Sequence, residues 1–560
     1  MTRSDLLSLT PDALAALANR GLVKRAAKDL DAGNGPDVTV SPDGDVDGAF
    51  PDGTKTSLPA GAGLEAATCS CAATGTCRHR ICLVLAYQRT GAEPAAPETA
   101  WSPGTFGDDA LARVLGQRAI TAARRTLRAG YSAKIRRPTA EDAVAQVELQ
   151  TCTVRFLVPD ELGYVHTDAV AAVRGEVTVL AVWAFRAADE RGLTGEDIRL
   201  DVGGGGSAGT AGGGPDTALD TALDLAGQVL LEGAMHAGPV LATALGRTAA
   251  DLSAAGLHWP AAALDDLAAQ LAAYHGRRAD HDPARNAELV AEVHARHRAA
   301  GTGGRSQVLG TNESADTPLR RVRLAALGCR VAGTPESRTA DIYLAHTGTG
   351  IVLVLKRRWD VPPGETLTGA DLAGRRILGS PLSALAAANV VSESATRSAG
   401  RLVRVASGRI AKTTVTPLGD AWDGLPAALL VRDLESEARA LDALPPRLVR
   451  PRVQAELARV IEIAEVRDIG YHPGAQRLEA VVADAAGTRA VVSADYSPHR
   501  PAALDALADA LAAAPRFISG TIRRDGGGLL IDPLAVQTAG GVVVPDLAAG
   551  DGTAALDAPA

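Results

Sequence analysis

The chain has 560 residues, which is far more than one hydrophobic core usually serves, so its length predicts about three to five domains. Hydrophobic residues make up 46% of the sequence and charged residues 22%, a composition typical of folded soluble proteins. The net charge of −8 argues against a protein that coats nucleic acid over its whole surface, so any nucleic-acid contact is expected to be local. No segment resembles a secretion signal or a membrane span, and a cytoplasmic location without membrane contact is expected.

The first ninety residues are predicted to combine short helices with a small meander of strands. Thr10-Pro11-Asp12 has the residue types of a helix start: a capping residue, a proline at the first helical position and an acid in the first turn. Pro42-Asp43-Gly44 and Pro51-Asp52-Gly53 are strong turn signals between short strands. A helix is expected over residues 80–89. Its side chains spaced to pack against the sheet are Ile81, Val84, Leu85 and Gln88.

A second, α+β domain is predicted over residues 104–202, after a linker rich in Pro, Ala and Thr at 90–103. Its expected elements are an arginine-rich helix over 108–128, strands near 132–135, 145–149 and 151–157, and a helix that holds Trp183 and Phe185. Residues 203–214 are almost only Gly, Ser, Ala and Thr. Because such a segment cannot bury apolar surface, it is predicted to be a flexible domain boundary.

Three further domains are predicted over 215–302, 305–445 and 446–548. In the first, Leu and Ala recur at helical spacing, and breaks near 238–239, 259–260 and 282–283 divide it into four helices. The second mixes short helices with strands at 351–356, 402–405 and 412–416 in an undetermined architecture.

For the last domain, the sequence predicts a definite order of strands and helices. Strands are expected near 460–471, 477–483 and 489–494, then a helix over 501–513, then strands at 517–523 and 529–534. Three strands, a helix and two strands is the order of an OB-fold, although other small α+β domains share it. The closing residues from Ala548 are expected to be disordered.

The most informative string runs from Cys69 to His79. Cys69-x-Cys71 and Cys77-x-His79 form two ligand pairs, and the five residues between the pairs suffice for a loop that brings them together. Three thiolates and one imidazole satisfy the tetrahedral preference of Zn²⁺ without a water ligand, which predicts a structural rather than a catalytic metal. In a module with so little apolar core, metal binding is expected to contribute on the order of 10 kcal/mol of folding free energy.

Other interpretations of these cysteines stay open. The residues could be unliganded thiols or a disulfide pair, and Cys82, three residues after His79, competes as a fourth ligand against a default role as a small buried side chain. Arg78 and Arg80 are expected to lower the pKa values of the thiols.

The ligand spacing resembles that of the SWIM zinc finger. Flanking sequences look like bacterial SWIM-finger proteins at Gly21-Leu22-Val23-Lys24-Arg25, Arg78-His79-Arg80, Leu83-Val84-Leu85-Ala86-Tyr87-Gln88 and, further on, Ala181-Val182-Trp183-Ala184-Phe185-Arg186. The resemblance covers residues 1–90 and extends to about 190. It implies a ββα finger whose metal ligands are Cys69, Cys71, Cys77 and His79. The fold class is therefore predicted as multidomain α+β, with this finger, α+β middle units, a helical module and a C-terminal β-rich domain of OB-like order.

Several other groups are candidates with a simpler alternative. A basic stretch could contact phosphates or be an ordinary solvated helix face; it consists of Arg113, Arg118, Arg124, Arg125, Arg128, Lys134, Arg136 and Arg137. A group of histidines and aspartates could form a second metal site, or its histidines could simply lie on the surface; it consists of His275, Asp280, His281, Asp282, His294 and His297. The run His346 to Gly350 leads into a strand, which favours a hairpin turn over a phosphate loop. Stacking platforms of an OB-fold could come from Tyr471, Tyr496 and Phe517. Cys152 and Cys329 are expected in cores.

Three functions are compatible with this sequence. We expect a non-catalytic zinc-binding adaptor with one structural Zn²⁺ and a protein partner, since the sequence shows no Walker loop, no HExxH motif and no GxSxG elbow between a strand and a helix. The resemblance implies DNA or protein binding, and in bacteria an association with AAA-type ATPases and von Willebrand A-domain proteins. The first alternative is a DNA- or RNA-binding protein that contacts phosphates through Arg78, Arg80 and the basic helix. The second is an enzyme without a recognisable motif.

Overall fold

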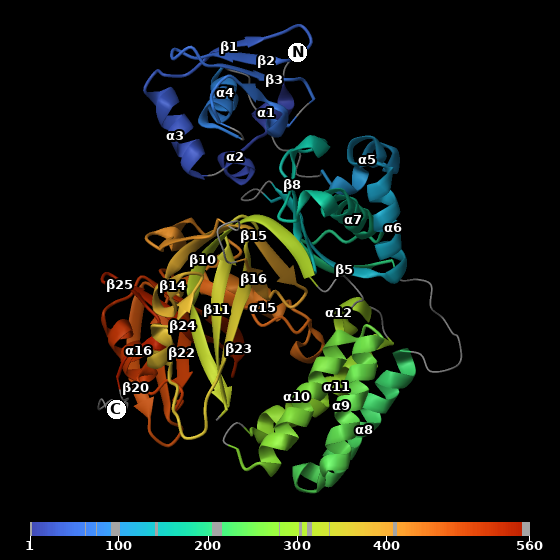
Figure 1. Ribbon diagram of the computed structural model, residues 1–560, viewed down its shortest axis with the longest axis vertical. Helices are drawn as coiled ribbons and strands as arrows, with labels where there is room; N and C mark the ends of the chain where they lie inside the picture. The colour runs from blue at the N-terminus through green and yellow to red at the C-terminus, as the bar shows by residue number, and fades with distance from the viewer. Residues whose placement is uncertain are drawn as a thin grey trace. The chain divides into compact units, whose positions relative to one another are not determined.

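The computed structural model describes residues 3–18, 20–61, 63–73, 76–90, 101–139, 144–203, 215–278, 281–301, 305–310, 316–334, 336–406 and 412–550 (Figure 1). The chain divides into two compact units, Met1–Ala208 and Gly209–Ala560. Most of the predicted linker at 90–103, nearly all of the predicted boundary at 203–214 and the closing residues 551–560 lie outside the described residues. No helix in the described ranges is long and apolar enough to cross a membrane.

The N-terminal segment of the first unit is a four-stranded antiparallel sheet covered by helices. Its elements are α1 (Ser4–Leu7), α2 (Pro11–Leu17), α3 (Arg20–Asp31), β1 (Asp37–Val40), β2 (Val46–Ala49), β3 (Lys55–Leu58), η1 (Leu64–Ala66), β4 (Thr68–Cys69) and α4 (Arg78–Arg89). The sheet order is β1-β2-β3-β4. As predicted, the Thr10 side chain caps α2 by accepting from the Ala13 N–H, and glycines at positive φ, Gly44 and Gly53, close the two hairpin turns.

Helix α4 is the central element of this segment. Ile81 and Val84 are fully buried, as their spacing predicts, in a core that includes Leu6, Leu14 and residues from the sheet. Gln88 has a different role from the predicted one, because its side-chain amide donates to the carbonyl oxygens of Leu6 and Leu9. These two bonds satisfy chain carbonyls next to α1 and fix the N-terminal residues over α4.

The rest of the first unit is a five-stranded antiparallel sheet with helices on one face. Its elements are η2 (Pro103–Thr105), α5 (Asp108–Leu115), α6 (Gln117–Ala129), β5 (Tyr131–Arg136), β6 (Ala145–Leu149), β7 (Thr153–Phe156), η3 (Leu162–Tyr164), β8 (Val165–Thr167), α7 (Ala171–Glu190) and β9 (Asp197–Val202), with sheet order β8-β7-β6-β5-β9. The predicted single helix over 108–128 is wrong in one respect. Gly116, at φ 85°, breaks it into α5 and α6, because this backbone conformation cannot continue a right-handed helix.

The core of the N-terminal segment extends into the second part of the first unit, which also has a core of its own. The cluster around Ile81 and Leu6 also contains Val144, Leu157 and Tyr164 from the second part. A buried polar network reinforces this junction: the Tyr164 hydroxyl donates to Asp5 at 2.8 Å, and Asp5 pairs with Arg3 at 2.7 Å. The N-terminal segment is therefore not packed independently of the rest of the first unit.

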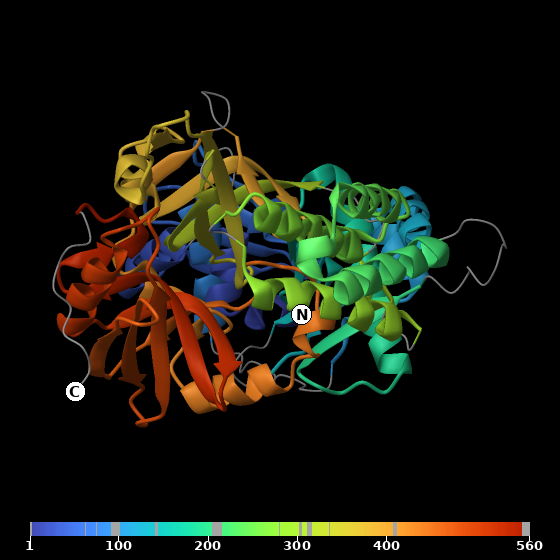
Figure 2. The ribbon, with the colours of Figure 1, turned by 90° about the horizontal axis from the view of Figure 1, so that it is seen from below.

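The second unit begins with antiparallel helices that lie side by side (Figures 1 and 2). They are α8 (Pro215–His236), α9 (Pro239–Ala254), α10 (His258–His275) and α11 (Pro283–Ala300), followed by the short α12 (Arg305–Leu309). Leucines at helical spacing meet in one core, which includes Leu245, Leu264 and Leu289. The prediction of four helices is confirmed, except that Pro260 lies in the first turn of α10 rather than at a break.

A β-barrel follows the helices. Its elements are β10 (Asp316–Thr334), β11 (Ser337–His346), β12 (Ile351–Asp360), α13 (Gly369–Ala373), β13 (Arg376–Ile377), β14 (Ser380–Pro381), α14 (Leu382–Leu385), β15 (Ala388–Ser398), β16 (Val403–Val405) and β17 (Thr414–Pro417). The sheet order is β12-β11-β10-β15-β16, and a parallel bridge between Val354 and Leu402 joins its two ends. The long strand β10 bends at a bulge next to Gly328, so that it pairs with β15 before the bend and mainly with β11 after it.

The C-terminal segment forms a second barrel. Its elements are η4 (Ala421–Gly424), β18 (Leu430–Val431), α15 (Leu434–Asp442), η5 (Arg447–Val449), β19 (Ala458–Glu462), β20 (Glu465–His472), β21 (Arg477–Ala483), β22 (Arg489–Asp495), α16 (Ala503–Ala512), β23 (Phe517–Asp525), β24 (Gly528–Thr538), β25 (Gly541–Val543) and η6 (Pro545–Leu547). The expected strand at 460–471 is bent into β19 and β20, which pair with β23 and β21 respectively. Strands β22 and β24 pair in parallel, as strands three and five of an OB-fold do.

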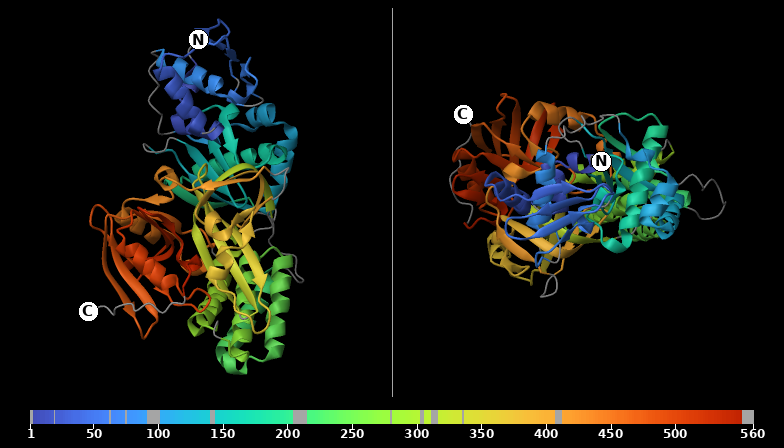
Figure 3. Two further views of the ribbon diagram at one scale, coloured as in Figure 1. Left: turned by 60° about the vertical axis from the view of Figure 1, so that its left-hand side comes forward. Right: turned by 90° about the horizontal axis from the view of Figure 1, so that it is seen from above.

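Both barrels have the same connectivity. If the strands of each barrel are numbered in chain order from the bent first strand, the order in which they pair around the barrel is 1-2-3-5-4, and strand four closes onto strand one. In both barrels, helices lie between strands three and four along the chain. Their adjoining faces share a core that includes Leu327, Val354, Trp422, Phe517 and Leu534 (Figure 3). Strand β18 and α15, which precede the predicted boundary at 445, belong to the C-terminal sheet and its core. The undetermined middle architecture is thus a barrel with the topology predicted for the last domain.

Candidate metal centre

The four predicted ligands converge at one end of the N-terminal sheet. One possible ligand atom each from Cys69, Cys71, Cys77 and His79 lies within 4.8 Å of the others. Cys69 ends β4, Cys77 is the residue before α4, and His79 lies in the first turn of that helix. The end of a strand and the start of a helix therefore supply the two ligand pairs, as the sequence predicts.

Hydrogen bonds to the neighbouring hairpin fix the first pair. The Ser70 N–H donates to the Lys55 carbonyl and the Lys55 N–H donates to the Ser70 hydroxyl oxygen, each at 2.9 Å. Cys77 and His79 are buried, whereas Cys69 and Cys71 are half-buried. Nitrogen Nδ1 of His79 lies 3.8 Å from Sγ of Cys69, so the ring presents this nitrogen to the cysteines.

The thiols differ in their proton affinity. The backbone N–H of Ala73, and then the side chain of His79, lower the pKa of Cys71 to about 6. Burial, and then the neighbouring thiols, raise the pKa of Cys69 to about 12. Without metal, Cys71 therefore loses its proton readily, whereas Cys69 keeps its proton, mainly because burial disfavours the charged form. A bound divalent cation would stabilise the thiolate of Cys69.

The arginines next to the ligands act differently from the expectation. The groups that lower the pKa of Cys71 do not include Arg78 or Arg80. Arg78 instead lies 3.6 Å from Asp29 and 3.8 Å from Asp52. Asp52 is also 3.4 Å from Nε2 of His79. In the sequence, Asp52 is recognisable only as a turn residue. The signal that could have pointed to it is its place in the turn before β3, the strand that pairs with the Cys69 strand β4.

The other cysteines have structural positions. Cys82 faces the core, where its thiol contacts the Ala26 carbonyl oxygen at 3.8 Å, and burial raises its pKa to about 11. It does not belong to the cluster of four ligand atoms. Cys152 and Cys329 are each 1% exposed, which confirms their predicted core positions.

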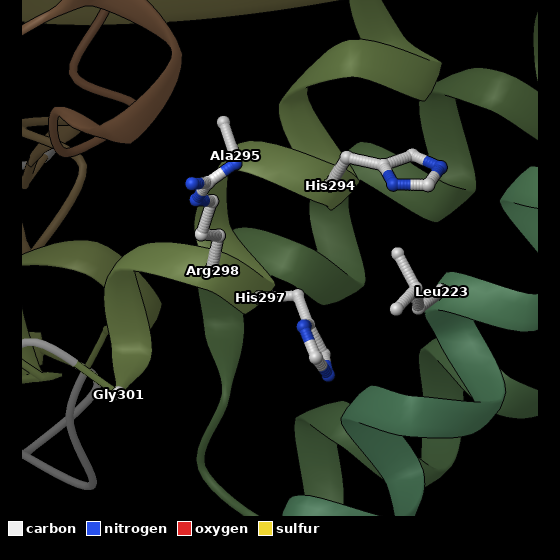
Figure 4. Close-up of a pocket in the computed structure, with 6 residues that line it drawn as sticks. All are labelled: Leu223, His294, Ala295, His297, Arg298 and Gly301. Atoms are coloured by element: carbon white, nitrogen blue, oxygen red, sulfur yellow. The ribbon is translucent and has the colours of Figure 1, made fainter.

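The histidines of the helical domain do not converge. His275 contacts the Ala237 carbonyl oxygen and His281 the Gln270 carbonyl oxygen. His297 lies 2.8 Å from Asp220, and with His294 it borders an open hollow between α8 and α11 (Figure 4). The described residues give these histidines no third metal-type ligand, and Asp280 lies outside the described ranges. Surface histidines, the simpler interpretation, account for them.

The predicted basic stretch separates into paired and free residues. Lys134, Arg136 and Arg137 pair with acids on their own sheet or on α7, and Arg124 lies 3.8 Å from Asp108. Within the described part of the chain, no acid pairs with three exposed residues that follow one face of α6, at positions i, i+7 and i+10: Arg118, Arg125 and Arg128.

The positions of the glycine-rich run and of the three candidate stacking aromatics decide between their alternative interpretations. The run from His346 to Gly350 is the hairpin turn between β11 and β12, as predicted. Phe517 is fully buried between the barrels, and Tyr471 packs against the core of the C-terminal barrel. Only Tyr496 of the three aromatic candidates is exposed. The C-terminal barrel therefore lacks the row of aromatic platforms that single-strand binding requires.

Two segments of the second unit match known domain families. Residues 216–310 match the YehQ four-helical bundle domain, and residues 455–560 match the YehQ C-terminal OB-fold domain. The multidomain α+β class, the helical module and the OB-fold are thereby confirmed. The chain is homologous to Protein YehQ of Escherichia coli (strain K12), with 28% identity over 575 residues that cover 96% of this chain and 90% of the relative. No solved structure matches the chain.

Proposed function

We propose that Cys69, Cys71, Cys77 and His79 bind one structural Zn²⁺ in a finger of SWIM type. The observation that carries this proposal is the convergence of four ligand atoms within 4.8 Å. Three sulfurs and one imidazole nitrogen match the preferred donors of Zn²⁺, and a complete set of four protein ligands is typical of structural sites. The metal would tie the end of β4 to the start of α4.

Elemental analysis of the purified full chain tests this site. The expected result is one zinc per chain, lost or strongly reduced in Cys71→Ser. Cys82→Ala is the matched control, because Cys82 lies in the neighbouring core and outside the cluster. Absence of zinc from the wild-type chain purified without chelators, or full zinc content in Cys71→Ser, would refute the assignment.

We further propose that the chain is a non-catalytic adaptor that binds a protein partner. An apolar patch at the α8–α9 corner supports this: Leu230, Leu231, Met235 and Val240 are 67%, 87%, 65% and 85% exposed. Gly233, at φ 68°, kinks the end of α8 beside them. Contiguous exposed apolar side chains of this kind mark interaction surfaces in folded proteins. The bacterial SWIM resemblance points to an AAA-type ATPase or a von Willebrand A-domain protein as the partner.

Co-purification with each of these two candidate partners tests the adaptor role. We expect a stable complex with one of them, and a loss of binding of at least tenfold in Leu231→Glu combined with Val240→Glu. Thr243→Glu is the control, since Thr243 is exposed on α9 without being apolar. Binding that is insensitive to the double substitution would remove the patch from the proposal, and no complex with either candidate would refute the proposed partners.

A second candidate function is sequence-independent binding of a nucleic-acid duplex through α6. Three exposed arginines on one face of α6, which pair with no acid in the described part of the chain, support it, because such a row of cations fits phosphate contacts. The apparent affinity for a labelled duplex should fall with salt at a log-log slope near −0.9 per phosphate contacted. Joint replacement of Arg118, Arg125 and Arg128 by Ala should flatten that slope, while Arg89→Ala should not. Absence of binding at low salt would refute this function.

A further inference from the structure

The two ring nitrogens of His79 face different neighbours. Nδ1 lies 3.8 Å from the Cys69 sulfur, on the side of the ligand cluster. Nε2 points the other way, 3.4 Å from Oδ2 of Asp52. A neutral imidazole carries one hydrogen, so binding a metal through Nδ1 requires that Nε2 bear it. Asp52 stands where that N–H would point.

The hairpin turn holds Asp52 in this position. Its other carboxylate oxygen, Oδ1, accepts the Thr54 N–H at 2.9 Å, so that Oδ2 faces the histidine. Phe50 packs edge-on against the His79 ring with the ring centroids 4.8 Å apart. Within the same turn the Phe50 N–H donates to the Thr54 carbonyl at 2.9 Å. One short turn thus supplies both a packing surface and an acceptor to the imidazole.

Arg78 completes the arrangement. Its guanidinium lies 3.8 Å from Asp52 and 3.6 Å from Asp29, and its Nε is 3.3 Å from Nε2 of His79. Once Nε2 carries a hydrogen it can no longer accept from Arg78. The guanidinium then keeps its two carboxylate neighbours, and it holds Asp52 from the side opposite to Thr54.

We propose that Asp52 is a positioning residue of the metal centre, which accepts the Nε2–H of His79, selects the tautomer that ligates through Nδ1 and raises the affinity for the metal. This inference rests on the proposed zinc site. A carboxylate behind a ligating histidine orients the ring and increases its basicity, and loss of such a partner weakens metal binding by about 10- to 100-fold.

The chain contains a matched control for this residue. Pro42-Asp43-Gly44 repeats the Pro-Asp-Gly sequence in the preceding hairpin, and both turn glycines have positive φ. Asp43 is exposed, and in the described structure no histidine pairs with it. Substitution of Asp43 therefore tests the effect of losing one turn carboxylate without touching the metal ligands.

The experiment measures the zinc dissociation constant of the full chain by competition with a chromophoric chelator. We expect Asp52→Ala to bind about 10- to 100-fold more weakly. Asp52→Asn should lie between it and the wild type, because the amide oxygen still accepts a hydrogen bond but carries no charge. Asp43→Ala should match the wild type. The Co²⁺ ligand-field spectrum should show the same three-sulfur, one-nitrogen ligand set in every variant, which separates positioning from loss of a ligand.

A second measurement follows the tautomer directly. Long-range ¹H–¹⁵N correlation spectra of the zinc-loaded wild type should show Nδ1 bound to the metal and Nε2 protonated. Asp52→Ala within twofold of the wild type in zinc affinity, or a metal bound through Nε2, would overturn this inference and leave the zinc site standing. A wild-type chain that binds no zinc would overturn the proposed function and, with it, the role of Asp52.

Discussion

The hydrogen bond between Tyr164 and Asp5 offers a test of how the finger segment is held to the rest of the first unit. Both residues are buried, at 1% and 8% exposure, and the hydroxyl donates to the carboxylate at 2.8 Å. Tyr164→Phe removes this bond and keeps the ring, so no cavity forms. A hydrogen bond to a charged group contributes roughly 1.5–3 kcal/mol. Asp5 keeps its two hydrogen bonds from Arg3, at 2.9 and 2.7 Å. We therefore expect the free energy of unfolding to fall by about 2 kcal/mol.

This loss should appear as a fall of about 4–8 °C in the melting temperature of the first unit, at about 2–4 °C per kcal/mol for a unit of this size. Hydrogen-exchange mass spectrometry assigns the loss to a region: protection should fall in α1 and α4 as well as near η3. Tyr131→Phe is the control, because its hydroxyl donates to the Leu180 carbonyl within the second part alone. Tyr131→Phe should lower the protection of backbone amides from exchange around β5 and α7 and leave the protection of α1 unchanged.

The effect also has a defined pH dependence. Burial alone would raise the pKa of Asp5, but its hydrogen bonds with Arg3 and Tyr164 bring that pKa below the ordinary value. A carboxyl whose pKa is lowered by folding stabilises the folded state above its unfolded pKa, and this stabilisation is lost as the pH falls. The difference between wild type and Tyr164→Phe should therefore shrink from pH 7 towards pH 3. A loss below about 0.5 kcal/mol at pH 7, or unchanged protection in α1, would refute the reasoning.

Three further predictions concern the metal and two close contacts. Because the pKa of Cys69 is raised to about 12, zinc must displace the proton of this thiol when it binds. The logarithm of the apparent zinc affinity should therefore rise by at least about one per pH unit from pH 7 to 9 in a competition titration. An affinity that does not change with pH would contradict this prediction. Gly369→Ala should destabilise the second unit by about 1–3 kcal/mol in urea unfolding, since an added Cβ would lie 1.7 Å from the Asp546 carbonyl oxygen. Arg296→Met should cost about 3 kcal/mol and speed amide exchange in α11, because it removes a partner of the buried Glu292; no change in exchange would show that the pair is not stabilising.

Much of the candidate site could be predicted from the sequence, because its four residues are close together along the chain. Cys69 to His79 spans eleven residues, and ligands so close along the chain reach one point through a single turn. The role of Asp52 was not readable, since seventeen residues and one hairpin separate it from Cys69 and only strand pairing brings it to His79. The effect assigned to Arg78 failed for a related reason, because the carboxylates it pairs with come from α3 and from the β2–β3 turn.

The sequence by itself determined the candidate metal ligands, the four long helices with their leucine spacing, the hairpin turns and the strand order of the last domain. Each of these features depends on residues that are close together along the chain. Tertiary structure alone decided three things. Gly116 splits the arginine-rich helix, and the bend at Gly328 lets β10 pair with both β15 and β11 in the barrel that precedes the C-terminal one. The N-terminal segment shares its core with Val144, Leu157, Val158 and Tyr164. These features depend on strand pairing and burial across long sequence separations, which local spacing does not encode.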